Sequence, residues 1–124
     1  MNINFAFYFL INFDFRNEAK MNYEELFSKY SNILQNDLKG HSVMNYISSR
    51  DDGYPFDKNR EKTNESGTKP LLSPGISQVY YGDESARSLN IKNTQGVANL
   101  RSNLNWNEIL NDSATKGNLL HWQN

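Results

Sequence analysis

The chain contains no cysteine, few prolines and glycines, and no apolar run long enough to span a bilayer. Without cysteine it can form neither a disulfide nor a thiolate nucleophile, although this absence does not fix its compartment. The apolar start, residues 1–15, is shorter than the roughly 20 apolar residues that cross a bilayer. It also lacks the basic region and the cleavage site of a secretory signal, so we expect a buried strand there and leave the localisation unknown.

An excess of charge of one sign is also missing. The 13 lysines and arginines nearly balance the 14 aspartates and glutamates, which gives a net charge of −1. This balance provides no electrostatic footprint for nucleic acid or for an anionic membrane, so neither is expected as a partner. Only 37% of the residues are hydrophobic, but 13% are aromatic and can each bury a large area. The length of 124 residues is that of one domain and allows a modest core.

The spacing of apolar residues in the first half predicts a strand, a helix and a second strand. Residues 5–15 and 42–47 are apolar runs typical of strands that are covered on both faces. Between them, residues 22–40 carry one apolar stripe at helical spacing. Asn22 and Glu25 resemble a capping box at the start of this helix.

The second half continues the alternation less clearly. Residues 58–69 contain no large apolar side chain and could form a solvated helix that starts at Asp57. Gly67 and Pro70 would weaken the end of such a helix. A Pro-Gly turn then leads into residues 76–81, which predict a third strand.

A long polar loop and a last helix from about Ser113 complete the predicted order. The apolar residues expected on one side of that helix are Leu119, Leu120 and Trp122. Strands that alternate with helices predict an α/β fold with parallel pairing, in which sites lie at the carboxyl ends of the strands. Two polar clusters, residues 50–52 and 82–84, directly follow strands and would share that face. Alternation alone favours ordinary polar loops at both places.

Four segments carry a resemblance to a known family. They are NFDFRNEAK (residues 12–20), NYISSRDD (45–52), SPGISQVYYGDES (73–85) and LRSNLNW (100–106). In content and order they resemble the sixth strand, the seventh strand, the eighth strand and the segment after it in the α-amylase family, glycoside hydrolase family 13, most closely its bacterial members. The resemblance implies that residues 1–124 are the carboxy-terminal part of a catalytic (β/α)8 barrel: about its last three strands with their helices.

The resemblance also implies roles for individual residues. Family members hydrolyse α-glucosidic bonds of starch-type glucans with retention, using an Asp that ends strand four and a Glu that ends strand five; neither has a counterpart here. Asp51 matches the third carboxylate, which stabilises the transition state. Arg50 replaces the family's His, and it is expected to pair with an acidic neighbour or to crowd the sugar subsite. Asp52 and Tyr81 are further candidates for substrate binding.

We therefore expect an amylase-like fragment that is inactive alone. A retaining glycosidase needs two carboxylates about 5–5.5 Å apart, and nothing in the spacing pairs the other acids Asp57, Asp83 and Glu84. Two alternatives stay open: a non-catalytic carbohydrate-binding or interaction module, and one half of a split enzyme whose partner chain supplies the missing strands.

Partners and cofactors follow from the same resemblance. An α-glucan or maltooligosaccharide is the expected ligand. No cofactor is expected in this chain, although calcium is common in the family. His41 and His121 form no metal-ligand cluster in the sequence. A sheet of three strands would leave open edges and an exposed inner face, which predicts self-association or pairing with a missing barrel half.

Overall fold

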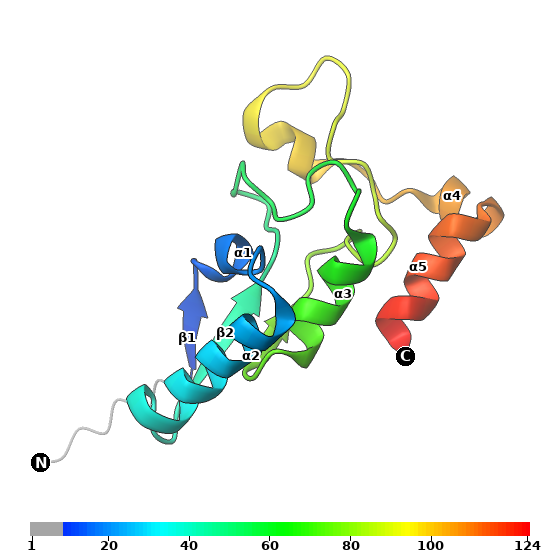
Figure 1. Ribbon diagram of the computed structural model, residues 1–124. Coiled ribbons are helices and arrows are strands. Elements are labelled where there is room, and N and C mark those ends of the chain that lie inside the picture. Colours follow the sequence, from blue (N-terminus) through cyan, green and yellow to red (C-terminus); the bar gives the residue numbers. More distant parts are fainter. Residues whose placement is uncertain (1–8) are drawn as a thin grey trace, which may run out of the picture.

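Three parallel strands form the sheet of the structure, a computed structural model that describes residues 9–124 (Figure 1). Strands β1 (Phe9–Asn12), β2 (Ser42–Tyr46) and β3 (Ile76–Gln78) lie side by side in chain order. Both neighbouring pairs are parallel. The predicted α/β class and the parallel pairing are therefore confirmed.

The first and third strands are shorter than predicted. The part of the first predicted strand that precedes Phe9 lies outside the described residues. The strand ends at Asn12 because its side-chain Oδ1 accepts a hydrogen bond from the Asp14 amide (3.2 Å), which turns the chain. Phe15 is buried in helix α1 (Phe15–Glu18) instead of lying in a strand.

The helix between β1 and β2 forms as predicted. Helix α2 (Tyr23–Asn32) continues into a π-helical segment, Ile33–Asp37. The Asn22 side chain accepts a hydrogen bond from the Glu25 amide at 2.9 Å, which is the expected N-cap. The segment ends before Gly40, whose φ of +79° is the left-handed conformation that glycine adopts without cost.

The apolar core lies between the sheet and the first helices. It consists of Phe15, Ala19, Leu26, Tyr30, Val43, Ile47 and Phe56. All of these residues lie in the first half of the chain. Burial of such side chains contributes about 1.5–3 kcal/mol each, so this half contains most of the hydrophobic stabilisation.

Helix α3 (Thr63–Leu72) corrects the prediction for the segment after β2. It begins six residues after Asp57 and continues through both Gly67 and Pro70. The Asp57 carboxylate is instead buried before the helix, where it accepts hydrogen bonds from the amides of Glu61 (2.8 Å) and Lys62 (3.0 Å).

Helix α3 is also buried along one side, although it was expected to be solvated. A Cβ at Gly67 would lie 3.2 Å from the Trp122 ring, so glycine permits the close approach of the two helices. Lys69 is 3% exposed, and its Nζ donates to the carbonyls of Ala19 (2.6 Å) and Met21 (2.9 Å). Tertiary contacts therefore stabilise α3, although its sequence has a weak intrinsic helix propensity.

The polar loop after β3 contains two short helices that the sequence did not predict. They are the 3-10 helix Gly96–Arg101 and α4 (Trp106–Asn111). The last helix, α5 (Ser113–Gln123), begins where predicted, and the Asp112 carboxylate caps it by accepting from the Thr115 amide at 2.7 Å. No helix within residues 9–124 is long and apolar enough to cross a membrane.

The face of α5 that packs inward contains two of the three predicted apolar residues. Leu120 is 57% exposed, whereas Leu119 and Trp122 are partly buried. Thr115 and Asn118 are the buried residues of this helix. The inward side of α5 is therefore mixed, because the polar Thr115 and Asn118 lie on it together with Leu119 and with Trp122, which packs against the apolar core.

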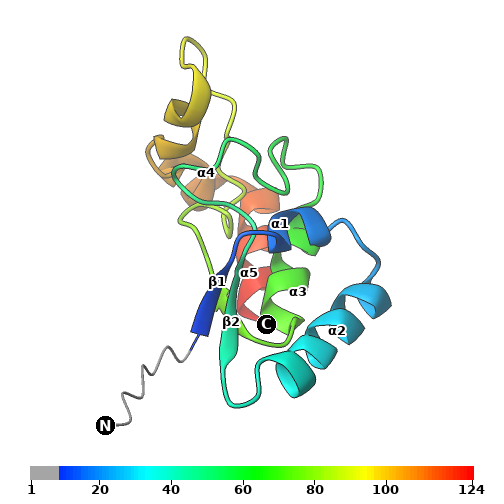
Figure 2. The same cartoon turned by 90° about the vertical axis from the view of Figure 1, so that its left-hand side faces the viewer.

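Within residues 9–124, no helix covers one face of the sheet. Figure 2 shows α1, α2 and α3 on the same side of the strands. The register places Met44 between Ile11 and Ile76 on the opposite face, where the two isoleucines are 50% and 43% exposed. Within the described part of the chain, β1 and β3 each pair along one edge only. The open wedge expected from the sequence is thus present.

Candidate functional site

The carboxyl ends of β1 and β2 border an open depression of about 320 Å³. Its lining consists of Phe13, Arg16, Tyr46, Ser49, Asp51 and Asp52. The polar cluster after β2 therefore contributes two carboxylates to a concave surface at the edge of the sheet where parallel α/β folds place their sites.

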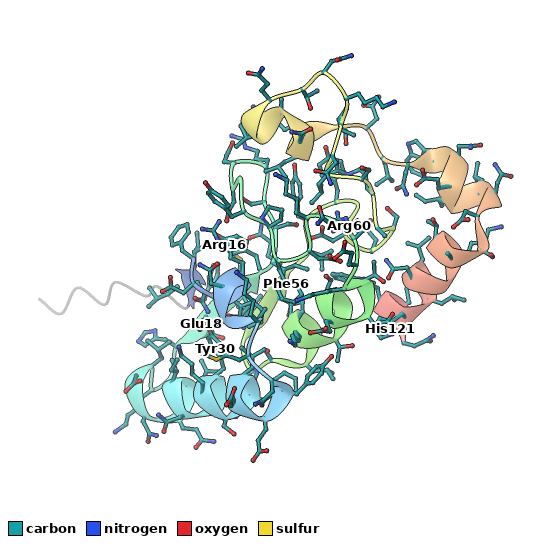
Figure 3. All side chains as sticks on the ribbon, turned by 45° about the horizontal axis from the view of Figure 1, so that its top comes forward. Arg16, Glu18, Tyr30, Phe56, Arg60 and His121 are labelled. Atoms are coloured by element: carbon teal, nitrogen blue, oxygen red, sulfur yellow. The ribbon has the colours of Figure 1, made fainter. Side chains whose placement is uncertain are left out.

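Asp52 forms an ion pair inside the depression. One of its carboxylate oxygens pairs with Arg16 Nη1, and the two side chains are only 10% and 22% exposed. The other oxygen accepts a hydrogen bond from the Tyr54 amide at 3.0 Å. Arg16 comes from α1, as Figure 3 shows, so this pair ties the exit of β1 to the exit of β2. Both oxygens of Asp52 are engaged by the protein.

Asp51 lies at the rim and is held by two arginines. Its Oδ2 accepts from Arg50 Nε at 2.9 Å and its Oδ1 from Arg101 Nη2 at 2.5 Å. These hydrogen bonds, first that of Arg50 and then that of Arg101, lower the pKa of Asp51. The carboxylate is therefore ionised at neutral pH and can accept hydrogen bonds or stabilise positive charge, but it cannot act as a general acid.

Arg50 makes the pairing that the sequence predicted. It contacts its acidic neighbour Asp51, and its side chain is 73% exposed outside the lining of the depression. Arg101 was not singled out in the sequence, although it lies in a segment that carries the family resemblance. It is 50 positions away from Asp51, and no local pattern predicts a contact across that separation.

Tyr81 does not join this group. Its hydroxyl donates to the Ser102 carbonyl at 2.7 Å, and the Arg87 guanidinium lies 4.4 Å from its ring centroid. Tyr81 is absent from the lining of the depression. The structure therefore brings together Arg50, Asp51 and Asp52 but places Tyr81 against the polar loop.

The other candidate acids have structural partners. Asp83 is 1% exposed, lies 2.9 Å from Arg60 Nη1 and accepts a hydrogen bond from Ser48. Burial raises its pKa, while Arg60 opposes that rise. Arg60 lies between α3 and the polar loop (Figure 3). Glu84 accepts from the Gly82 amide at 2.9 Å. Neither acid lines the depression beside Asp51.

No group of three or more His, Cys, Asp or Glu side chains within residues 9–124 could hold a metal ion. Calcium binding, which the resemblance made conceivable, therefore stays a prediction for this chain.

The two groups near the site that the sequence did not single out, Arg101 and Arg87, are both arginines of the polar loop. Their charge was visible, but their partners are backbone carbonyls and distant residues that only the fold brings close.

The fold is mixed α/β, and the candidate site is a depression at the strand ends whose carboxylates are paired with arginines. No protein-family model matches the chain. It is similar to the periplasmic alpha-amylase of Escherichia coli (strain K12), with 32% identity over 116 residues. The match covers 92% of this chain and 16% of that protein, so the chain spans about a sixth of the length of the curated relative. This supports an amylase-like relationship for the chain.

Proposed function

We propose that the chain is an amylase-like segment that supplies one sugar-binding wall of an α-amylase-type site and none of its bond-breaking groups. The observation that carries the proposal is the position of Asp51, an ionised carboxylate at the rim of a strand-end depression, in a segment that resembles the one with the family's third carboxylate. The 32% identity over 116 residues supports the same assignment.

The proposal includes a finer assignment of the fold. The strands β1, β2 and β3 correspond to the sixth, seventh and eighth strands of a (β/α)8 barrel, which join in chain order and in parallel. The open face of the sheet would then be the interior of a barrel. Two exposed isoleucines on that face support this assignment, because barrel interiors are filled by bulky branched side chains.

The chemistry of the depression suits a sugar. Asp51 would accept hydrogen bonds from vicinal hydroxyl groups and stabilise positive charge on a reacting ring. Phe13 is 67% exposed and packs edge-to-face on Tyr46, with 6.3 Å between the ring centroids. It would therefore present an apolar ring to the C–H face of a sugar. Hydrolysis with retention requires a nucleophilic carboxylate and an acid/base carboxylate, whereas Asp51 is paired with Arg50 and Arg101 and Asp52 is paired with Arg16. We expect no hydrolysis by this chain alone.

The test uses the purified 124-residue chain. Incubation with starch should release no reducing ends. Titration with maltoheptaose should shift the NMR signals of Phe13, Tyr46 and Asp51 saturably, and Asp51→Asn should abolish these shifts. Asp37→Asn is the matched control, because Asp37 is exposed on the π-helical segment and outside the depression. Starch hydrolysis that Asp51→Asn abolishes would contradict the claim of inactivity, and unsaturable shifts would contradict the binding site.

The open sheet face favours a second possibility, in which a separate chain completes the site. An amylase truncated before its sixth strand would be mixed with this chain, and starch hydrolysis would be measured. Activity that appears only in the mixture supports a split enzyme. Saturable sugar binding without activity in the mixture supports a non-catalytic carbohydrate-binding module.

A further inference from the structure

Arg101 connects the polar loop to the candidate sugar site. It ends the 3-10 helix Gly96–Arg101, and its side chain reaches back across 50 positions to the exit of β2. Its Nη2 donates to Asp51 Oδ1 at 2.5 Å and its Nε to the Arg50 carbonyl at 3.4 Å. It therefore contacts both the carboxylate and the backbone beside it.

The backbone carbonyls on both sides of Arg101 accept hydrogen bonds from three side chains, of which Arg87 is buried, Tyr80 is partly buried and Tyr81 is exposed. The Leu100 carbonyl accepts from the Tyr80 hydroxyl (2.8 Å) and from Arg87 Nη2 (3.1 Å). The Ser102 carbonyl accepts from the Tyr81 hydroxyl and from Arg87 Nη1 (3.3 Å). We call the three donor residues, Tyr80, Tyr81 and Arg87, the carbonyl clamp.

The carbonyl clamp is anchored by its arginine. Arg87 is 1% exposed, and its guanidinium stacks on the Tyr81 ring. Leu100, the residue before Arg101, is 2% exposed and anchors the 3-10 helix. Two fixed carbonyls on either side of one residue restrict the directions in which its side chain can leave the backbone. For Arg101 that direction leads to Asp51.

We infer that Arg101 is a positioning residue that holds the carboxylate of Asp51 at the rim of the depression. Asp51 is 59% exposed, and Arg50, its other partner, is even more exposed and adjacent in sequence. Among the partners of Asp51 within residues 9–124, Arg101 is the one that comes from a part of the molecule distant in sequence. Tyr81 then acts by holding the Ser102 carbonyl and does not contact the ligand.

This inference deepens the proposed function and depends on it where it concerns sugar. An exposed ion pair contributes little to global stability, so the purpose of the Arg101 contact is orientation of Asp51. A carboxylate that is already oriented loses less freedom when a ligand binds, which strengthens binding. Loss of Arg101 should therefore weaken binding of a maltooligosaccharide without unfolding the chain.

The first experiment measures the pKa of Asp51 directly, by NMR detection of its carboxyl carbon during a pH titration. Arg101→Gln should raise this pKa toward the ordinary aspartate value. Lys92→Gln is the matched control, because Lys92 is an exposed cation in the same loop. An Asp51 pKa that is unchanged in Arg101→Gln, or that rises equally in Lys92→Gln, would overturn the inference. Protection of the Leu100 amide, in the 3-10 helix, from hydrogen exchange should stay unchanged.

The second experiment measures maltoheptaose affinity. Arg101→Gln should weaken it by about fivefold, the upper range for an exposed ion pair, whereas Lys92→Gln should not. Tyr81→Phe removes only the hydroxyl, so it should weaken affinity by a smaller factor, while Tyr54→Phe, on an 80% exposed tyrosine, should not. Unchanged or tighter binding by Arg101→Gln would overturn the positioning role. If the unmodified chain does not bind maltoheptaose, the proposed function fails, and the Asp51 pKa still decides the role of Arg101.

Discussion

The first half of the described chain and the segment after α3 are stabilised in different ways. Between Phe15 and Phe56, buried apolar side chains fill the space between helices and sheet. In the loop after β3, the large buried side chains include Arg87 and Asp83, which contact carbonyls, a hydroxyl and another arginine. Apolar packing tolerates small shifts because it is non-directional, whereas hydrogen bonds need defined distances and angles.

This difference has a functional consequence. The residues that border the depression come from the region with the apolar core, but the contact that fixes Asp51 comes from the polar loop. The geometry of this site therefore depends both on apolar packing in the first half and on polar contacts of the loop after β3. Substitutions that affect one region and spare the other can therefore separate their contributions.

Replacement of Arg87 should have the largest effect. Arg87→Ala removes the guanidinium that donates to the carbonyls of Tyr81, Leu100 and Ser102 and leaves a cavity at a side chain that is 1% exposed, at a cost of about 3–5 kcal/mol in the free energy of unfolding. Urea denaturation, monitored by tryptophan fluorescence, measures this change in the free energy of unfolding. Arg50→Gln is the control and should change stability little, because Arg50 is 73% exposed. An Arg87→Ala chain as stable as the original would show that the polar loop is held by other contacts.

Replacement of Leu26 tests the apolar region. Leu26 is fully buried in α2, and Leu26→Ala should cost about 3 kcal/mol through lost transfer energy and a residual cavity. Hydrogen exchange should show loss of protection in α2 and β2 for this variant. In Arg87→Ala, by contrast, the loss should be concentrated at residues 81–102. Identical exchange patterns for the two variants would mean that the regions unfold as one unit.

Replacement of Glu18 should have the smallest effect and should depend on pH. Glu18 and Tyr30 point toward each other between α1 and α2 (Figure 3), and Lys29 Nζ lies 2.5 Å from the Glu18 carboxylate. Although burial works to raise the pKa of Glu18, the hydrogen bonds from Lys29 and Tyr30 lower it overall.

Because the folded-state pKa of Glu18 is lowered, its ionised form stabilises the fold above the unfolded-state pKa, and this contribution disappears as the pH falls through the folded value. Glu18→Gln should therefore cost about 1 kcal/mol at pH 7 and almost nothing in strong acid. The measurement is urea denaturation across that pH range, with Glu24→Gln, on the exposed side of α2, as the control. A cost that does not change with pH would contradict the ionised pairing.

Much of the fold was predictable because its first half obeys simple patterns. The apolar stripe and the Asn22 cap predicted α2, and the apolar run from Ser42 predicted β2. The patterns failed where tertiary contacts outweighed propensity. Helix α3 runs through Gly67 and Pro70 because Trp122 packs on it and Lys69 anchors it to the α1–α2 connection.

The candidate site was predictable in part for the same reason. Asp51 and Asp52 directly follow a predicted strand, and parallel sheets gather such residues at one edge. The pairing of Asp52 with Arg16 and of Asp51 with Arg101 joins residues 36 and 50 positions apart, which no local spacing encodes. Tyr81 was assigned to the ligand because it ends a predicted strand, but β3 stops at Gln78 and the tyrosine turns to the loop.

The sequence by itself determined the α/β class, the order of the strands, the principal helix caps and the placement of Asp51 at a strand end. These features depend on apolar periodicity and on residues a few positions apart, which the chain displays locally. Only the tertiary structure decided which arginine holds which carboxylate, how the loop after β3 is anchored and which face of the sheet stays open. Those outcomes depend on directional contacts between distant residues, and such contacts exist only once the chain has folded.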